Sequence, residues 1–176
     1  MAHDPAPAPL RLIESLCNTA THLWGTDQLS TMADANDWLR QNGFAEIRQP
    51  SCLAELVAAR ELIRAFLIDR ADEGVRARLN TLAQSCLGAP QLGPAGSLTF
   101  SNGGAPSWPV GPVVEALFLH GLSGAGERLK ACAAPDCHYV FYDHSRSRTG
   151  TWCDMNICGA RHKMRRHRQR GRPQEP

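Results

Sequence analysis

The sequence has no apolar run of about 18 residues, the minimum length of a membrane-spanning helix. Residues 1–9, rich in alanine and proline, lack the basic and apolar regions of a secretion signal. We therefore expect a cytoplasmic protein with no membrane partner and with a flexible leader over residues 1–9. In a reducing compartment, seven cysteines in a chain are better explained by metal binding than by disulfides, and their odd count agrees.

The sequence also lacks the patterns of common catalytic sites. No order of serine, histidine and aspartate and no carboxylate pair stands out, so we expect no enzyme activity. The segment Gly121-Leu-Ser-Gly-Ala-Gly126 superficially resembles a dinucleotide-binding loop. Its glycine spacing is wrong and it follows an expected helix instead of a strand, which excludes that function.

Apolar residues make up 43% of the chain and charged residues 20%, which is typical of a folded globular protein. Apolar residues recur three or four apart through most of the first 120 residues, which predicts helices. We expect a mainly α (α+β) N-terminal domain over residues 10–125. The expected elements are helices over 10–24, 31–43, 53–67, 75–86 and 113–120, and a small hairpin between 88 and 112 with a strand at 97–101 and a turn at Asn102-Gly103.

Four cysteines lie in the last quarter of the chain as Cys132-x4-Cys137 and Cys153-x4-Cys158, with 15 residues between the pairs. Two knuckle-like turns can each present two sulfurs to one ion, which favours a tetrahedral structural zinc site. An iron–sulfur cluster also takes four thiolates, and four unliganded thiols are a further alternative. The aromatic run at 138–142 predicts a strand that pairs with 149–152.

Charge is distributed unevenly along the chain. Eleven basic residues against three acidic ones give residues 128–172 a charge of about +8, so the remainder carries about −6. After Cys158, good helix formers carry most of these cations, and a metal ligand at the start of this helix would orient them. Arginine matches phosphate geometry, which makes nucleic acid the expected partner. The candidate nucleic-acid-binding residues are Arg146, Arg148, Arg161, Lys163, Arg165, Arg166, Arg168 and Arg170.

Other interpretations of the basic segment stay open. A basic run is often a solvated tail. It could also dock an acidic partner protein as part of a zinc-stapled interaction module. A nonspecific binder of RNA or single strands is a third alternative, with Tyr139, Phe141, Tyr142 and Trp152 as stacking platforms.

Cys132-x4-Cys137-His-Tyr-Val-Phe-Tyr, followed by Trp152-Cys153-x4-Cys158-Gly-Ala-Arg, resembles the CGNR zinc finger. That family pairs a treble-clef-like finger with an N-terminal ABATE domain and is named for stress-induced transcription regulation. Leu16-Cys17-Asn18-Thr19, before a helix that carries Trp38 and Leu39, resembles the opening of the ABATE domain. The sequence departs from the name-giving motif, because Ala160 stands where asparagine is usual.

The resemblance implies one structural zinc on the four cysteines and DNA binding by a finger over residues 126–172 that ends in a basic helix, with a short tail at 173–176. It also implies an N-terminal domain, residues 10–125, that senses an unidentified small ligand. Asn18 and Thr19 are the candidate ligand-binding residues. A single finger reads few bases, so a homodimer is a plausible arrangement.

Overall fold

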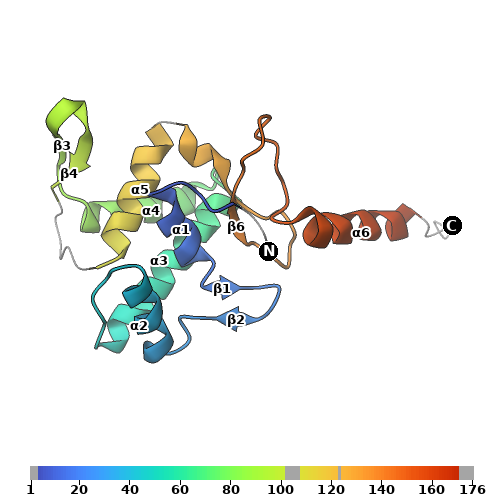
Figure 1. Ribbon diagram of the computed structural model, residues 1–176, viewed down its shortest axis with the longest axis horizontal. Coiled ribbons are helices and arrows are strands. Elements are labelled where there is room, and N and C mark those ends of the chain that lie inside the picture. Colours follow the sequence, from blue (N-terminus) through green and yellow to red (C-terminus); the bar gives the residue numbers. More distant parts are fainter. Residues whose placement is uncertain (1–3, 102–107, 123, 171–176) are drawn as a thin grey trace.

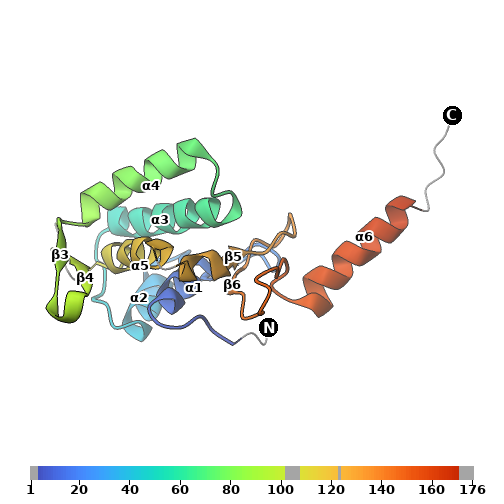
Figure 2. The ribbon, with the colours of Figure 1, turned by 90° about the horizontal axis from the view of Figure 1, so that it is seen from above.

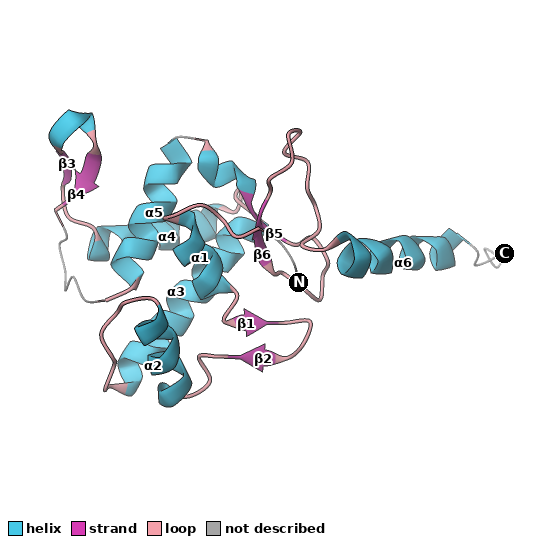
Figure 3. Cartoon of the chain, in the orientation of Figure 1, coloured by secondary structure: helices cyan, strands magenta, loops and turns pink. Residues whose placement is uncertain are grey.

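The computed structural model describes residues 4–101, 108–122 and 124–170. Within these ranges the chain forms six α-helices and three two-stranded antiparallel hairpins (Figures 1 and 3). This confirms the expected mainly α fold with a C-terminal finger and basic helix. The helices are α1 (Leu10–Cys17), α2 (Met32–Gln41), α3 (Pro50–Ile68), α4 (Glu73–Cys86), α5 (Val110–Leu122) and α6 (Ala160–Arg170). The hairpins are β1 (Ala20–Thr21) with β2 (Thr26–Asp27), β3 (Pro90–Leu92) with β4 (Leu98–Phe100), and β5 (Leu129–Ala131) with β6 (Val140–Tyr142).

The hydrophobic core lies between α1, α3 and α5, and α4 covers the other side of α3 (Figure 2). Its central side chains have no exposed surface, among them Ile13 of α1, Ile63 of α3 and Val113 of α5. Burying such a side chain contributes about 1.5–3 kcal/mol, so this helical core supplies most of the stability of the N-terminal part. Among the described residues, no helix is both long and apolar enough to cross a membrane.

The second helix forms as its sequence predicts. Thr31 precedes α2, and its hydroxyl accepts a hydrogen bond from the backbone N–H of Asp34 at 3.1 Å. The helix ends before Gly43, whose φ of +79° is the left-handed conformation that glycine adopts without strain. Local signals at both ends therefore determine this element.

The first helix is shorter than the expected 10–24, and that prediction was wrong beyond Cys17. The chain leaves α1 at Asn18 and continues into the β1–β2 hairpin, whose turn contains Gly25 with a φ of +65°. Trp24, the last residue of the expected helix, lies in this turn with 59% of its surface exposed. The spacing of apolar residues alone therefore overestimated the length of this helix.

The strand expected at 97–101 is present as β4, but its partner β3 precedes it. The hairpin turns through Gly93 and Ser97, where the Gly93 N–H donates to the Ser97 carbonyl at 2.7 Å. The turn predicted at Asn102-Gly103 lies outside the described residues.

The pairing expected for the aromatic run was also wrong. β6 pairs with β5, which precedes it, and not with 149–152. The reason is burial, because Leu129 of β5 and Val140 of β6 are both completely buried in the core of the helical domain. The segment 149–152 instead contacts the turn between Cys132 and Cys137, where the Thr151 carbonyl accepts a hydrogen bond from the Ala133 N–H at 3.1 Å. The β5–β6 hairpin thus joins the finger to the helical core.

Candidate metal centre and nucleic-acid interface

The four cysteines of the C-terminal module converge on one point. Their Sγ atoms all lie within 4.8 Å of one another, and all four residues are buried. Cys137 and Cys153 have their sulfurs 3.6 Å apart, and Cys153 and Cys158 have theirs 3.8 Å apart. A tetrahedral zinc ion with Zn–S bonds of about 2.3 Å requires S–S separations of about 3.8 Å. The cluster therefore has the geometry that one zinc ion needs.

Two tight turns present these sulfurs. In the first, the Cys137 N–H donates to the Ala134 carbonyl at 2.9 Å, and His138 follows with a φ of 51°. In the second, the carboxylate of Asp154 accepts from the N–H groups of Asn156 at 2.7 Å and Ile157 at 3.1 Å. Asp154 caps a short π-helical turn (Met155–Gly159) that leads into α6.

Gly159 lies in a tightly packed part of the second turn. A Cβ atom at this position would lie 3.1 Å from Met155 Sδ and 3.4 Å from Trp152 Cδ1. Ala160, which replaces the usual asparagine, is the next residue and begins α6 with helical φ and ψ. Because Asp154 already caps the turn, the helix start is formed without a polar side chain at position 160.

The electrostatics of the cluster favour a cation. Hydrogen bonds from the Cys137 and Cys153 thiols lower the pKa of Cys132, and the hydrogen bonds of Cys153 with Cys132 and Cys137 raise the pKa of Cys153. Burial raises the pKa of Cys158 to about 12. Without a metal, the cluster thus stabilises one thiolate and disfavours deprotonation of the other cysteines. Zinc, in contrast, binds the deprotonated form of all four. Four thiolate ligands leave no open coordination position, so the ion contributes folding energy.

The metal site is attached to the helical domain by partly buried polar contacts from two side chains. The Asn18 side chain pairs with the backbone of Val140, donating from Nδ2 to the carbonyl at 2.7 Å and accepting from the N–H at 2.9 Å. Arg64 of α3 donates from Nη1 to the carbonyl of His138, the residue after the ligand Cys137, at 3.2 Å. The finger and the N-terminal domain are therefore held together at the first knuckle.

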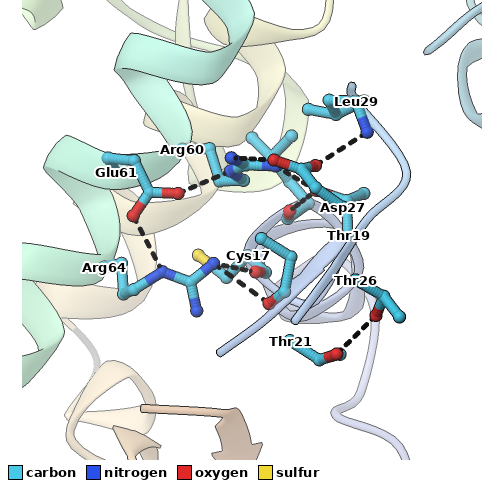
Figure 4. Close-up of polar contacts among 11 residues, drawn as sticks. Cys17, Thr19, Thr21, Thr26, Asp27, Leu29, Arg60, Glu61 and Arg64 are labelled. Carbon is cyan, nitrogen blue, oxygen red and sulfur yellow. Dashed lines mark hydrogen bonds and ion pairs between the residues drawn. The ribbon is translucent and has the colours of Figure 1, made fainter. Parts of the chain in front are cut away.

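Arg64 belongs to a buried network with Arg60, one helical turn earlier (Figure 4). Arg60 makes a two-point contact with the Asp27 carboxylate of β2 at 2.6 and 2.8 Å, which lowers the pKa of Asp27. Glu61 accepts from the Nε atoms of both arginines, at 2.7 and 3.1 Å. Arg64 Nη2 also donates to the carbonyls of Cys17 and Ala20. The side chains of Arg60 and Arg64 are only 4% and 3% exposed, so these partners, and not water, must stabilise the two charges.

Arg60 and Arg64 were not among the residues expected to have a special role. The signal that indicates them is the presence of two arginines four residues apart within the longest apolar helix, a position where an unpaired charge would be costly. Their partners lie near the end of α1 and in the β1–β2 hairpin, which sequence spacing does not reveal.

Asn18 and Thr19, the candidate ligand-binding residues, have their polar atoms engaged inside the protein. Asn18 forms the two bonds to Val140. The Thr19 hydroxyl donates to the Leu16 carbonyl at 2.7 Å and accepts from Arg60 at 3.1 Å. These contacts give both residues a structural role, and ligand binding by them stays a prediction. A cavity of about 940 Å³ lies elsewhere, lined in part by Cys52, Cys86 and Trp108.

The basic residues of α6 lie on two opposite faces of the helix. Arg161 and Arg165 are one turn apart and face Asp136 of the first knuckle, which pairs with Arg161 and lies 4.0 Å from Arg165 Nη1. Arg168, at 161+7, lies on this same inner face. The spacing i, i+3, i+7 places Lys163, Arg166 and Arg170 together on the outer face, where all three are exposed.

Packing of the His162 ring against Trp152, with centroids 4.7 Å apart, further fixes the start of α6 on the finger. No described residue of α6 is buried, and the helix projects from the body of the protein (Figures 1 and 2). The metal site thus holds one end of a solvent-exposed cationic helix.

Arg146 and Arg148 lie apart from α6, in the loop after β6. Asp143 organises this loop, because its carboxylate accepts from Lys130 Nζ at 2.7 Å, from the Ser145 N–H at 3.0 Å and from the Gly150 N–H at 2.7 Å. Both arginines are exposed, and Arg148 Nη1 lies 3.9 Å from the Glu127 carboxylate. The loop rises away from the start of α6 in Figure 1, so the structure does not bring these two residues into one cluster with the helix.

Comparison with known protein families gives two matches. Residues 128–171 match the CGNR zinc finger. Residues 10–125 match the ABATE domain, described as "putative stress-induced transcription regulator". No curated protein matches the chain at a significant level. The finger match and the four converging thiols assign one structural zinc ion to the cysteine site. The chain belongs to the ABATE family and carries a CGNR zinc finger at its C-terminal end.

Proposed function

We propose that the protein is a DNA-binding regulator of transcription in which the outer face of α6 contacts duplex DNA. The observation that carries this proposal is the exposed triad of Lys163, Arg166 and Arg170 on a helix whose other face is fixed to a zinc-bound knuckle. Arg161 and Arg165 of the inner face have a carboxylate partner in Asp136, whereas the described ion pairs include none with Arg168 or with the outer-face residues. The outer face is thus available to phosphates.

The dimensions of α6 suit the major groove. Its 11 residues span about 16 Å at 1.5 Å per residue. A helix fits the major groove of B-DNA, which is about 12 Å wide. Arginine and lysine contacts to phosphate release counterions, so affinity should fall steeply with salt. The fully coordinated zinc suits a structural role, and we propose no enzymatic activity for the chain.

The N-terminal helical domain is the part of the protein that we propose to sense a small ligand. The end of α1 holds β6 through Asn18, and α3 holds the residue after the first knuckle through Arg64. A change in this domain would therefore reach the base of the finger through polar contacts. Such a connection is what a ligand-responsive regulator needs.

The proposal is tested by changing Lys163, Arg166 and Arg170 together to alanine in the full zinc-loaded chain. Affinity for a 20-base-pair duplex should fall by about tenfold or more at moderate salt, because each lost cation removes a phosphate contact. Circular dichroism and zinc content should be unchanged, since none of the three side chains is buried.

A matched variant removes three exposed arginines from the helical domain, Arg11, Arg48 and Arg78, and so makes the same change in net charge. It should bind DNA about as well as the original protein. Equal loss in both variants would mean that only net charge matters. No duplex binding by the original protein at low salt would favour docking to an acidic partner protein instead.

A further inference from the structure

A second, smaller cavity lies beside the junction between the helical domain and the finger. It has a volume of about 310 Å³ and is lined by the end of α3, by α4 and by the end of α5, together with Gly126. Its apolar wall consists of Phe66, Leu79, Leu117 and Phe118. Such a volume is at the lower end of the range of small-molecule sites.

Arg70 at the wall of this cavity is a half-buried cation that makes no ion pair within 4.0 Å in the described part of the chain. Its guanidinium carbon lies 5.3 Å from the centre of the Phe66 ring. Nη2 donates to the carbonyls of Gly126 at 2.9 Å and Leu129 at 2.7 Å. Burial lowers the pKa of Arg70, against the weaker effect of Glu127.

A second arginine stands at the same wall. Arg76 of α4 donates from Nη1 to the carbonyls of Arg70 at 3.2 Å and Ala71 at 2.9 Å. Its Nη2 lies 3.9 Å from the carboxylate of Glu73, whose side chain is 92% exposed, so water screens that pair. Two cations next to an apolar wall favour an anion that also has an apolar body.

We propose that this cavity binds a small organic carboxylate. The carboxylate pairs with Arg70 and Arg76, and an aromatic or short aliphatic body packs against Phe66, Leu117 and Phe118. The larger cavity of about 940 Å³ is a weaker candidate for this ligand. The charged residues at its edge are Glu46, Arg48 and Glu55, which are all exposed and of mixed sign.

The position of the cavity gives the ligand a route to the finger. Arg70 holds the carbonyls of Gly126 and Leu129, and Leu129 is the first residue of β5. A carboxylate that pairs with Arg70 competes with these carbonyls and so acts on the segment that enters the finger. The role of the ligand as an effector rests on the DNA binding proposed above, whereas its binding does not.

The test is calorimetric titration of the full zinc-loaded chain, without DNA, with three probes. Benzoate carries both the charge and the apolar body, benzyl alcohol lacks the charge, and acetate lacks the ring. Benzoate should bind about tenfold or more tightly than either control, because only it satisfies the cations and the apolar wall together. Equal binding of benzoate and benzyl alcohol, or no binding of benzoate at millimolar concentration, would overturn the proposal.

A variant that fills the cavity makes the test specific to this site. Gly121 lines the cavity, and an added Cβ there meets no atom within 4 Å. Gly121→Leu should weaken benzoate binding about tenfold or more, and Gly121→Ala should leave it nearly unchanged. Equal benzoate affinity in the two variants would show that the anion binds elsewhere.

A charge variant with its own control completes the design. Arg76→Gln should weaken benzoate binding, whereas Arg78→Gln, on the same helix but outside the cavity, should not. Equal weakening by the two would contradict the assignment of the carboxylate to Arg76. DNA binding is measured separately on each sample, so loss of one activity is distinguished from loss of the other.

Discussion

Asn18 and Val140 are 122 positions apart in the chain, yet they form two hydrogen bonds of the kind that pairs neighbouring strands. The amide of Asn18 donates to the Val140 carbonyl and accepts from its N–H, so one side chain satisfies the backbone of a β6 residue. This pair places the end of α1 against the hairpin that carries the first zinc knuckle. It is a direct polar link between the two sequence-matched regions.

Removal of the Asn18 amide should loosen the finger. Asn18→Ala leaves the partly buried N–H and carbonyl of Val140 without their partner, which should lower the free energy of unfolding by about 1–3 kcal/mol. Zinc should also exchange faster from the variant, as measured by transfer to a chromophoric chelator. Asn36→Ala is the matched control, because Asn36 makes the same pair of bonds to Ile47 within the helical domain. The Asn36→Ala variant should lose a similar free energy of unfolding, but its zinc should exchange at the rate of the original protein.

Arg64→Met should destabilise the protein more than most single changes. The methionine retains apolar volume but leaves the carbonyls of Cys17, Ala20 and His138 without a donor. Loss of one partner from a buried charged network costs about 3–5 kcal/mol, which chemical denaturation would detect. Arg11→Met, at an exposed site, should change stability by less than about 0.5 kcal/mol. Similar values for both variants would contradict a structural role for the network.

The lowered pKa of Asp143 predicts that the stability of the protein depends on pH. Burial alone would raise the pKa of Asp143, but bonds from Lys130, Ser145 and Gly150 outweigh it and hold the pKa well below the usual range. The unfolded chain therefore takes up a proton near pH 4 while the folded chain does not, so this contribution is present at neutral pH and is lost on acidification.

Asp143→Asn is the variant that measures this effect. Because zinc release at low pH affects both proteins, the difference between their free energies of unfolding isolates Asp143. The original protein should be the more stable at pH 7, and the difference should narrow as the pH falls below about 4. A difference that does not change with pH would refute the assignment.

Thiol labelling should divide the seven cysteines into three groups. Burial raises the pKa of Cys17 to about 12, so this thiol should not react with iodoacetamide at pH 8 in the folded protein. Cys52 and Cys86 are only partly buried and should react. The ligands Cys132, Cys137, Cys153 and Cys158 should become reactive only after chelation. Mass spectrometry of the labelled peptides would check each group, and rapid labelling of the four ligands with zinc present would contradict the metal assignment.

Features with local determinants were predictable from the sequence. The cysteine spacing predicted four sulfurs at one point, and Thr31 and Gly43 marked the limits of α2 because caps act within a few residues. The basic helix followed from consecutive good helix formers after Cys158. The fold class was predictable for the same reason.

Features with distant determinants were not predictable. The helical pattern continues past Cys17, but the pairing of Asn18 with Val140 accompanies a change of direction that no local signal marks. The partner of β6 is selected by burial of Leu129 in a core formed by three helices. The contact of Arg60 with Asp27 spans 33 positions and depends on the tertiary structure. Spacing rules describe one element at a time and do not contain this information.

The salt dependence of DNA binding tests the central claim most directly. Affinity for random duplex DNA is measured against salt concentration for the zinc-loaded protein and for the triple alanine variant at Lys163, Arg166 and Arg170. Each phosphate contact contributes about 0.9 to the slope of log affinity against log salt, so the variant should have a slope shallower by about 2 to 3. Equal slopes for the two proteins would contradict contact between the outer face of α6 and DNA.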